Sequence, residues 1–73
     1  MAERGIATEE SLKAELLEFE QRYGVDSFEL RRLHVADEAP AQVDPHDRAV
    51  WLGTLERWEW VRERMRQRAA SSR

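Results

Sequence analysis

Two histidines close to acidic side chains are the residues of this chain best suited to bind a metal ion. His34 and His46 share one short stretch with three aspartates, Asp37, Asp44 and Asp47, so imidazole and carboxylate ligands occur together. Neither histidine stands at a recognised ligand spacing from another histidine or acid, and Asp44 and Asp47 are well placed to cap a helix. We therefore expect no metal and no cofactor.

Nucleophilic side chains are no better placed for catalysis. The chain contains no cysteine and no glycine-rich phosphate-binding sequence. Its serines occupy cap, first-turn or tail positions without a local nucleophile motif: Ser11, Ser27, Ser71 and Ser72. We expect no catalytic residue, no enzyme activity and no small-molecule substrate.

The length of the chain restricts its architecture. A chain of 73 residues forms one small domain, and a core of that size supplies only about 3–5 kcal/mol of stability. Without cysteine no disulfide supplements this core, so a partner or a second copy is the usual remaining support. No apolar run approaches the ~18 residues of a membrane span, and the start lacks a signal sequence. The chain is therefore expected to be cytoplasmic, without membrane contact.

The first amphipathic helix is predicted for residues 8–23. Thr8 is a good N-cap, and Gly24 fits a left-handed cap at the C-terminal end. Apolar side chains recur at helical spacing on one side of the segment: Leu12, Leu16, Phe19 and Tyr23. This stripe is expected to face the core.

A short second helix is predicted for residues 27–34. Asp26 and Glu29 have the spacing of a capping box, in which each side chain accepts a hydrogen bond from the backbone of the other. Val25 and Leu30 have the spacing of a hydrophobic staple across the same helix start. Residues 35–43, which include Pro40, then form a connecting loop.

The longest helix is predicted for residues 45–68. Asp44 is its N-cap and Pro45 its first residue, where the missing N–H costs nothing. Its core side consists of Trp51, Thr54, Leu55, Trp58, Val61 and Met65. Residues 8–68 are thus expected to form an all-α domain, an antiparallel hairpin of two long helices bridged by the short one. Residues 1–7 and 69–73 are expected to be flexible.

A second side of the long helix carries Ala49, Gly53 and Trp60, opposite Trp51. Glycine inside a helix costs about 1 kcal/mol relative to alanine, so its use at position 53 suggests that a partner approaches closely there. The alternative is a tolerated surface glycine beside one exposed tryptophan. We favour a contact surface, because a tryptophan beside small residues suits an interface anchor.

The charge of the chain is distributed unevenly. Residues 1–47 hold 12 acidic and 5 basic residues, net −7, whereas residues 48–73 hold 3 acidic and 7 basic ones, net +4. Arg57, Arg64 and Arg68 share one side of the long helix and are added to the candidate partner-binding surface. Alternatively, the arginines of this helix pair with Glu59 and Glu63 or with the acidic half. Nucleic-acid binding by this chain alone is the less favoured hypothesis.

A family resemblance rests on the end of the first helix and the start of the second. Residues 15–25 read ELLEFEQRYGV and residues 26–29 read DSFE. Together with the tryptophan-containing helix that continues to Arg62-Glu63-Arg64-Met65, they resemble a group of small acidic bacterial and archaeal proteins over residues 12–65. Members of that group look like antitoxin components of toxin–antitoxin pairs. The resemblance implies a protein that neutralises a partner.

Three functional hypotheses follow. The first is an antitoxin-like interaction protein that sequesters a protein partner through exposed positions of the long helix. The second is a nucleic-acid-associated regulator that uses the C-terminal arginines. The third is a structural homodimer.

Overall fold

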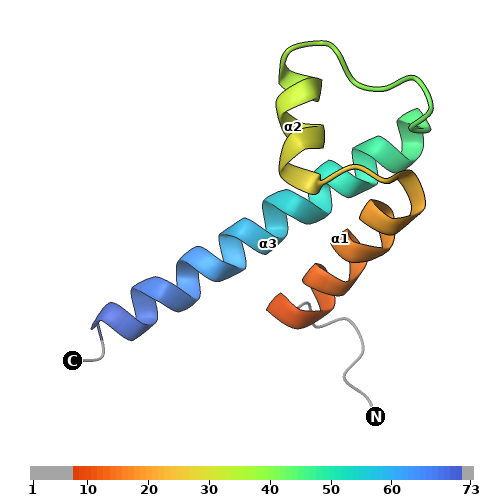
Figure 1. The fold of residues 1–73 in the computed structure, drawn as a ribbon. Helices are drawn as coiled ribbons and strands as arrows, with labels where there is room; N and C mark the ends of the chain where they lie inside the picture. The colour runs from red at the N-terminus through yellow and green to blue at the C-terminus, as the bar shows by residue number, and fades with distance from the viewer. Residues whose placement is uncertain (1–7, 72–73) are drawn as a thin grey trace.

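The chain is all-α, as predicted. The computed structural model describes residues 8–71, and within them it has three helices and no strand: α1 Glu9–Tyr23, α2 Ser27–Val35 and α3 Pro45–Ser71 (Figure 1). Residues 1–7 and 72–73, predicted to be flexible ends, lie outside the described range. None of these helices has the length and apolar character needed to cross a membrane.

Both ends of α1 are closed as the sequence predicts. Thr8 is the N-cap and forms a capping box with Ser11: the Ser11 N–H donates to Thr8 Oγ1 at 3.1 Å, and the Thr8 N–H donates to Ser11 Oγ at 3.0 Å. Gly24 ends the helix with φ 71°, and its N–H donates to the Glu20 carbonyl at 2.8 Å. Glycine adopts this left-handed conformation without the steric cost that other residues carry.

The start of α2 is capped by Asp26, but the predicted reciprocal bond from Glu29 is wrong. Asp26 Oδ2 accepts from the N–H groups of Phe28 and Glu29 at 3.0 and 3.3 Å. The Glu29 carboxylate turns outward and binds Arg32 with both oxygens. A carboxylate from α1 acts at this helix start instead, because Glu20 Oε2 accepts from the Ser27 N–H at 2.9 Å.

The end of α2 lies at Val35, one residue beyond the predicted boundary. Asp37 follows with φ 63°, its N–H donating to the His34 carbonyl at 3.0 Å. The Glu38 N–H donates to the Leu33 carbonyl at 2.7 Å. These two bonds form a Schellman motif with aspartate at the left-handed position that glycine usually takes.

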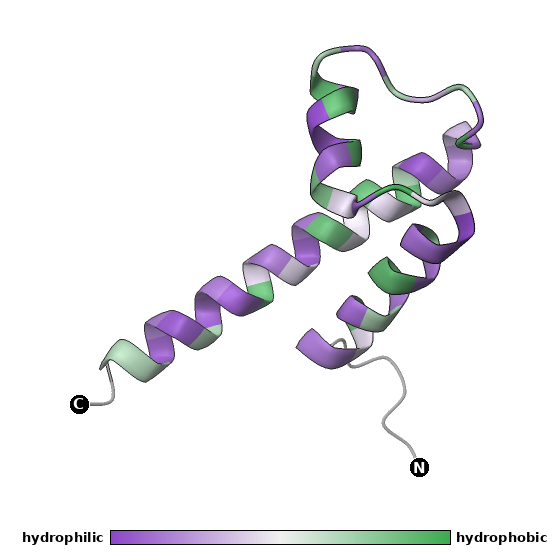
Figure 2. Ribbon diagram, viewed as in Figure 1, coloured by the Kyte–Doolittle hydropathy of each residue, from purple (hydrophilic) through white to green (hydrophobic). Residues whose placement is uncertain are grey.

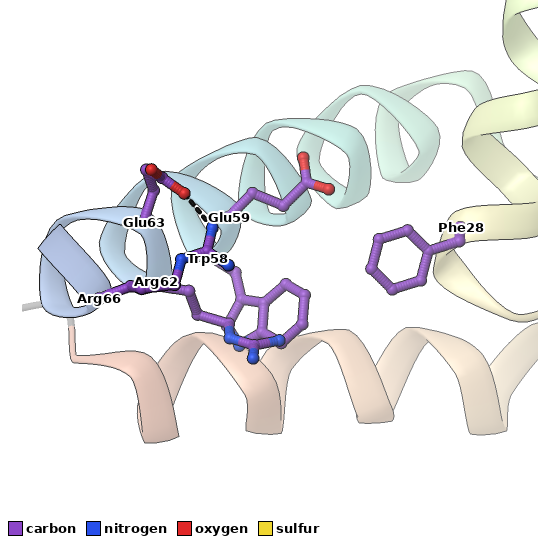
Figure 3. Close-up of a pocket in the computed structure, with 6 residues that line it drawn as sticks. All are labelled: Phe28, Trp58, Glu59, Arg62, Glu63 and Arg66. Atoms are coloured by element: carbon purple, nitrogen blue, oxygen red, sulfur yellow. Dashed lines mark hydrogen bonds and ion pairs between the residues drawn. The ribbon is translucent and has the colours of Figure 1, made fainter. Parts of the chain in front are cut away.

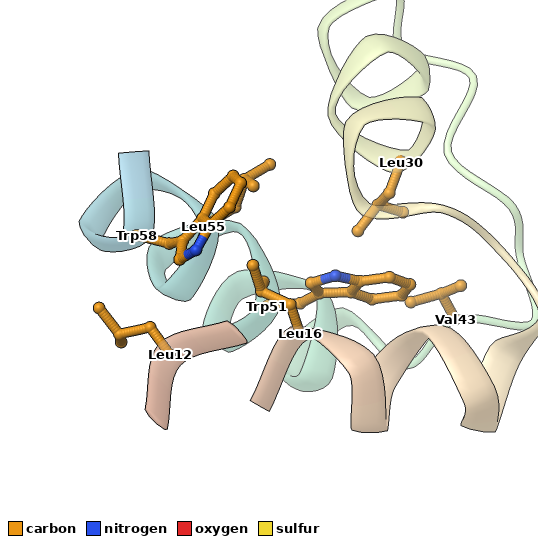
Figure 4. Packing of buried hydrophobic residues seen from close by; sticks show 7 residues of the cluster. All are labelled: Leu12, Leu16, Leu30, Val43, Trp51, Leu55 and Trp58. Atoms are coloured by element: carbon orange, nitrogen blue, oxygen red, sulfur yellow. The ribbon is translucent and has the colours of Figure 1, made fainter. Parts of the chain in front are cut away.

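The core lies where α1, α2 and α3 meet. Its buried apolar residues are Leu12, Leu16, Leu30, Val43, Trp51, Leu55 and Trp58 (Figure 4). Trp51 is completely buried, and its ring stacks on Phe19 at 5.3 Å and on Tyr23 at 5.9 Å between centroids. Val43, predicted as part of a plain connecting loop, is 1% exposed. It therefore anchors the loop to the core just before α3.

Contacts between α1 and α3 follow opposite residue orders along the two helices. The Tyr23 hydroxyl donates to Asp47 Oδ2 at 2.6 Å, whereas at the other end of α1 Glu9 Oε2 lies 3.6 Å from Arg62 Nε. The first described residues of α1 therefore meet α3 only about two thirds of the way along it. Beyond Val61, every described side chain of α3 is exposed.

We name residues 62–70 the projecting segment (Figure 1). Figure 2 shows that hydrophilic residues dominate it. Met65, predicted to face the core, is 53% exposed because it borders only the start of α1, where it lines an open hollow with Glu9 and Glu10. The predicted end of α3 is also corrected: the helix continues past Arg68 to Ser71, through two alanines that favour helix.

Candidate functional site

All six residues predicted to bind a partner lie on one side of α3, opposite the buried Trp51. We name this set the strip; it consists of Ala49, Gly53, Arg57, Trp60, Arg64 and Arg68. Gly53 is partly buried and the other five are exposed. The helical period therefore brings them to one continuous surface.

Trp60 is the most prominent side chain of the strip. It is 59% exposed, whereas Trp51 and Trp58 are 0% and 6% exposed. The Arg64 guanidinium lies over the Trp60 ring, 4.7 Å from its centroid, in a cation–π contact. A shallow hollow of about 300 Å³ borders this ring, and its lining includes Met65. An aromatic ring beside an open hollow offers a place for an apolar side chain of another molecule.

Two arginines of the strip have no carboxylate partner among residues 8–71, namely Arg57 and Arg64. Five other arginines do have one: the pairs are Arg22–Asp47, Arg31–Glu59, Arg32–Glu29, Arg62–Glu9 and Arg66–Glu63. Arg48, outside the strip, has none among residues 8–71. The prediction that arginines of α3 simply pair with nearby acids therefore explains Arg62 and Arg66. It does not explain Arg57 and Arg64.

Two acids beside the strip, Glu59 and Glu63, are engaged elsewhere. Both Glu59 oxygens accept from Arg31 of α2, at 2.5 and 3.0 Å, and this hydrogen bonding raises the pKa of Arg31. Glu63 binds Arg66, and that hydrogen bond lowers the pKa of the Glu63 carboxyl. No acid stands three or four residues from Arg57 or Arg64, the spacing at which side chains of a helix meet. Glu56, next to Arg57, is exposed and forms no ion pair with either arginine, so the cations at positions 57 and 64 remain without an ion-pair partner among residues 8–71.

Gly53 has open space above its backbone. A Cβ placed there would meet only Arg57 Nη1, at 3.9 Å, which is an ordinary contact distance. No described part of the chain therefore requires glycine at this position. The close approach predicted at Gly53 involves no neighbour within residues 8–71, and a partner there stays a prediction.

A second hollow, of about 330 Å³, lies on the other side of α3 (Figure 3). Phe28 is 46% exposed and meets Trp58 edge-on at 5.9 Å, while Arg62 covers the Trp58 ring at 4.9 Å. The remaining lining residues are Glu59, Glu63 and Arg66. All four charged residues here form ion pairs, so this hollow lacks the unpaired cations of the strip.

The residues considered for a metal site have other roles or stay apart. His34 and His46 are exposed, and within residues 8–71 no three histidine, aspartate or glutamate side chains come together. Asp47 Oδ2 accepts from the Tyr23 hydroxyl and, at 3.2 Å, from Arg22. The Tyr23 hydrogen bond is the main cause of a lowered pKa at Asp47 and of a raised pKa at Tyr23. Asp47 therefore joins α1 to α3, a role beyond the predicted cap.

Ser27 belongs to a buried hydrogen-bond chain that the sequence did not reveal. Its hydroxyl donates to Glu20 Oε2 at 2.6 Å and accepts from Trp51 Nε1 at 2.8 Å. The residue is only 1% exposed, so a substrate cannot reach its oxygen. The arrangement satisfies the buried indole N–H and links all three helices.

No protein-family model, curated protein or solved structure matches the chain.

Proposed function

We propose that this chain is a small antitoxin-like interaction protein that binds and neutralises a protein partner in the cytosol. In this proposal α1 and α3 form an antiparallel hairpin bridged by α2, which holds the strip rigid. The protein acts by contact, without enzyme activity, membrane contact or cofactor.

The observation that carries the proposal is an exposed tryptophan between two uncompensated arginines. Tryptophan and arginine are the residues most enriched among those that dominate binding energy at interfaces. Trp60 is 59% exposed, with Arg57 one turn before it and Arg64 over its ring. Arg62 and Trp58, by contrast, already have partners inside the chain.

The proposal is tested by co-expression with the protein encoded by the neighbouring reading frame. That protein alone should arrest growth, and the full chain should restore growth by forming a complex of defined mass. Trp60→Ala should abolish the rescue. Val35→Ala removes another exposed apolar side chain, 78% exposed on α2, and should leave rescue intact.

Two results would reject parts of the proposal. A neighbouring protein that is not toxic would remove the antitoxin assignment. Equal rescue by wild type and Trp60→Ala, with unchanged circular dichroism, would show that the strip is not the interface.

A further inference from the structure

The strip has the spacing of a helix–helix seam. Gly53, Arg57, Trp60 and Arg64 follow one another at steps of about four, three and four residues, the repeat by which one helix packs along another. The side chains of this seam are a small residue, two cations and an aromatic ring. A helix that packs here must present side chains that suit a cation, an aromatic ring and a second cation in that order.

We infer that the partner places on this strip an acidic helix, in which two carboxylates seven residues apart flank an apolar side chain. This inference rests on the proposed function and specifies the chemistry of its partner. Arg57 and Arg64 are separated by two helical turns, about 10.5 Å along the axis. Carboxylates at positions i and i+7 of a parallel or antiparallel helix have the same separation, so both pairs form together.

The apolar side chain of the partner has a defined place between the two ion pairs. It lies at i+3 or i+4, opposite Trp60, and packs on the exposed ring and into the adjoining hollow of about 300 Å³ beside Met65. The Arg64 guanidinium is already held over the Trp60 ring at 4.7 Å, so it faces a carboxylate with little loss of side-chain freedom. Gly53 lets the partner backbone come close at the end of the seam.

Charge distinguishes this occupant from a second copy of the chain. Two copies whose seam contains both arginines, either parallel in register or antiparallel about a centre midway between Arg57 and Arg64, would bring these arginines of one copy against the same arginines of the other. Neither cation is neutralised by a carboxylate within residues 8–71, so this arrangement is repulsive. An acidic helix removes the repulsion, and the occupant is therefore a different protein.

The test uses the full chain and a synthetic alanine-based helical peptide of about 18 residues. One peptide carries Glu at i, Leu at i+3 and Glu at i+7, and a second carries Gln in place of both Glu. Binding is followed through the NMR signal of the Trp60 indole N–H, assigned with Trp60→Phe. The Glu peptide should shift this signal, and the Gln peptide should bind about tenfold more weakly, about threefold for each exposed ion pair lost.

A double variant, Arg57→Gln with Arg64→Gln, completes a thermodynamic cycle. It should weaken the Glu peptide about tenfold and leave the Gln peptide unchanged, since the two losses describe the same ion pairs. Arg32→Gln, on α2 and paired with Glu29, is the matched control and should change neither peptide. Circular dichroism should show the same helicity for all variants.

The outcomes separate this inference from the proposed function. The acidic-helix inference is overturned if millimolar peptide does not shift the Trp60 indole signal, or if the Glu and Gln peptides bind equally. Loss of growth rescue by Trp60→Ala would still support the proposed function in that case. Displacement of the Glu peptide by duplex DNA or single-stranded RNA that binds more tightly would also overturn it, in favour of phosphate binding. Tight binding of the Glu peptide that depends on Arg57 and Arg64 supports the acidic-helix inference, even if the neighbouring protein proves not to be toxic.

Discussion

The two parts of α3 have the same backbone and opposite environments. In residues 45–61 the inward side chains are buried, with Trp51 and Leu55 fully covered, whereas every residue from 62 to 70 is exposed. The apolar period continues through both parts, from Trp58 to Val61 and Met65. What changes is the neighbour, because α1 begins at Glu9, beside Arg62. Burial thus depends on the length of the facing helix as well as on the pattern of α3 itself.

The two parts are also stabilised by different interactions. The first part gains its stability from apolar burial against α1 and α2. The projecting segment relies on helix propensity and on local pairs such as Glu63 with Arg66 and Gln67. Local pairs of this kind contribute only a few tenths of a kcal/mol each. The projecting segment is therefore expected to open more readily than the rest of α3.

Exchange of a tryptophan for alanine in each environment gives the largest expected contrast. Trp51→Ala should cost about 3–5 kcal/mol, because it empties the centre of the core, and in so small a domain it should abolish the folded state. Trp60→Ala should change the free energy of unfolding by less than about 0.5 kcal/mol. Chemical denaturation followed by circular dichroism measures both. Similar losses in the two variants would contradict the proposed difference in environment.

A smaller effect is expected from the buried hydrogen-bond chain. Ser27→Ala removes the acceptor of the Trp51 N–H and leaves a buried polar group without a partner, at a cost of about 1–3 kcal/mol. Ser11→Ala, in the exposed capping box of α1, removes the acceptor of the Thr8 N–H and should cost about 1 kcal/mol or less. Denaturant midpoints compare the two serines. A larger loss at Ser11 would mean that the packed region does not depend on this hydrogen bond.

The two described glycines should respond to alanine with opposite signs. Gly24→Ala should destabilise by about 1–2 kcal/mol, since φ is 71° there, although nothing lies within 4 Å of the added carbon. Gly53→Ala should stabilise the isolated chain by about 0.5–1 kcal/mol, because it raises helix propensity on an open surface. Melting temperatures of the two variants decide the signs. Destabilisation by Gly53→Ala would reveal a contact at the strip even without a partner.

The smallest effect concerns the acid stability of the α1–α3 junction. The pKa of Asp47 is lowered in the folded state from its usual value of 3.8, mainly by the Tyr23 hydrogen bond. Its stabilising contribution is therefore complete above pH 3.8 and is lost as the pH falls further, through the lowered pKa. Tyr23→Phe should flatten the fall in stability across this acid range and leave its slope near neutral pH unchanged. Thermal melts over a pH series measure this dependence. The same loss of stability at acid pH in Tyr23→Phe and wild type would contradict the prediction.

The sequence was a good guide to features set by residues close together along the chain. Thr8, Gly24 and Asp26 were correctly predicted as caps because each acts on backbone groups within a few residues. The repeating apolar positions likewise predicted that Leu12, Leu16, Trp51 and Leu55 would be buried. Asp37 escaped prediction because aspartate adopts a positive φ far less often than glycine.

Features that depend on the relative placement of helices could not be predicted. A helical wheel puts Met65 on the core side, yet it contains no information on where the facing helix ends. The link from Glu20 to Ser27 and Trp51 joins residues up to 31 positions apart. The unpaired state of Arg57 and Arg64, by contrast, agrees with the sequence, because no acid stands three or four residues from either one. The same six residues of the strip were named from the sequence, but this charge imbalance was not.

The projecting segment of α3 also determines how the molecule moves through solution. Residues 8–71 measure 46 × 32 × 16 Å and their Cα radius of gyration is 14.2 Å, whereas a compact chain of this length has one of about 11 Å. Such an extended particle experiences more drag than a sphere of equal mass, so the monomer should elute from a gel-filtration column like a heavier globular protein. A column calibrated with globular standards would then report a dimer where only one chain is present. Light scattering or sedimentation equilibrium gives mass independently of shape and is the appropriate measurement for the homodimer hypothesis.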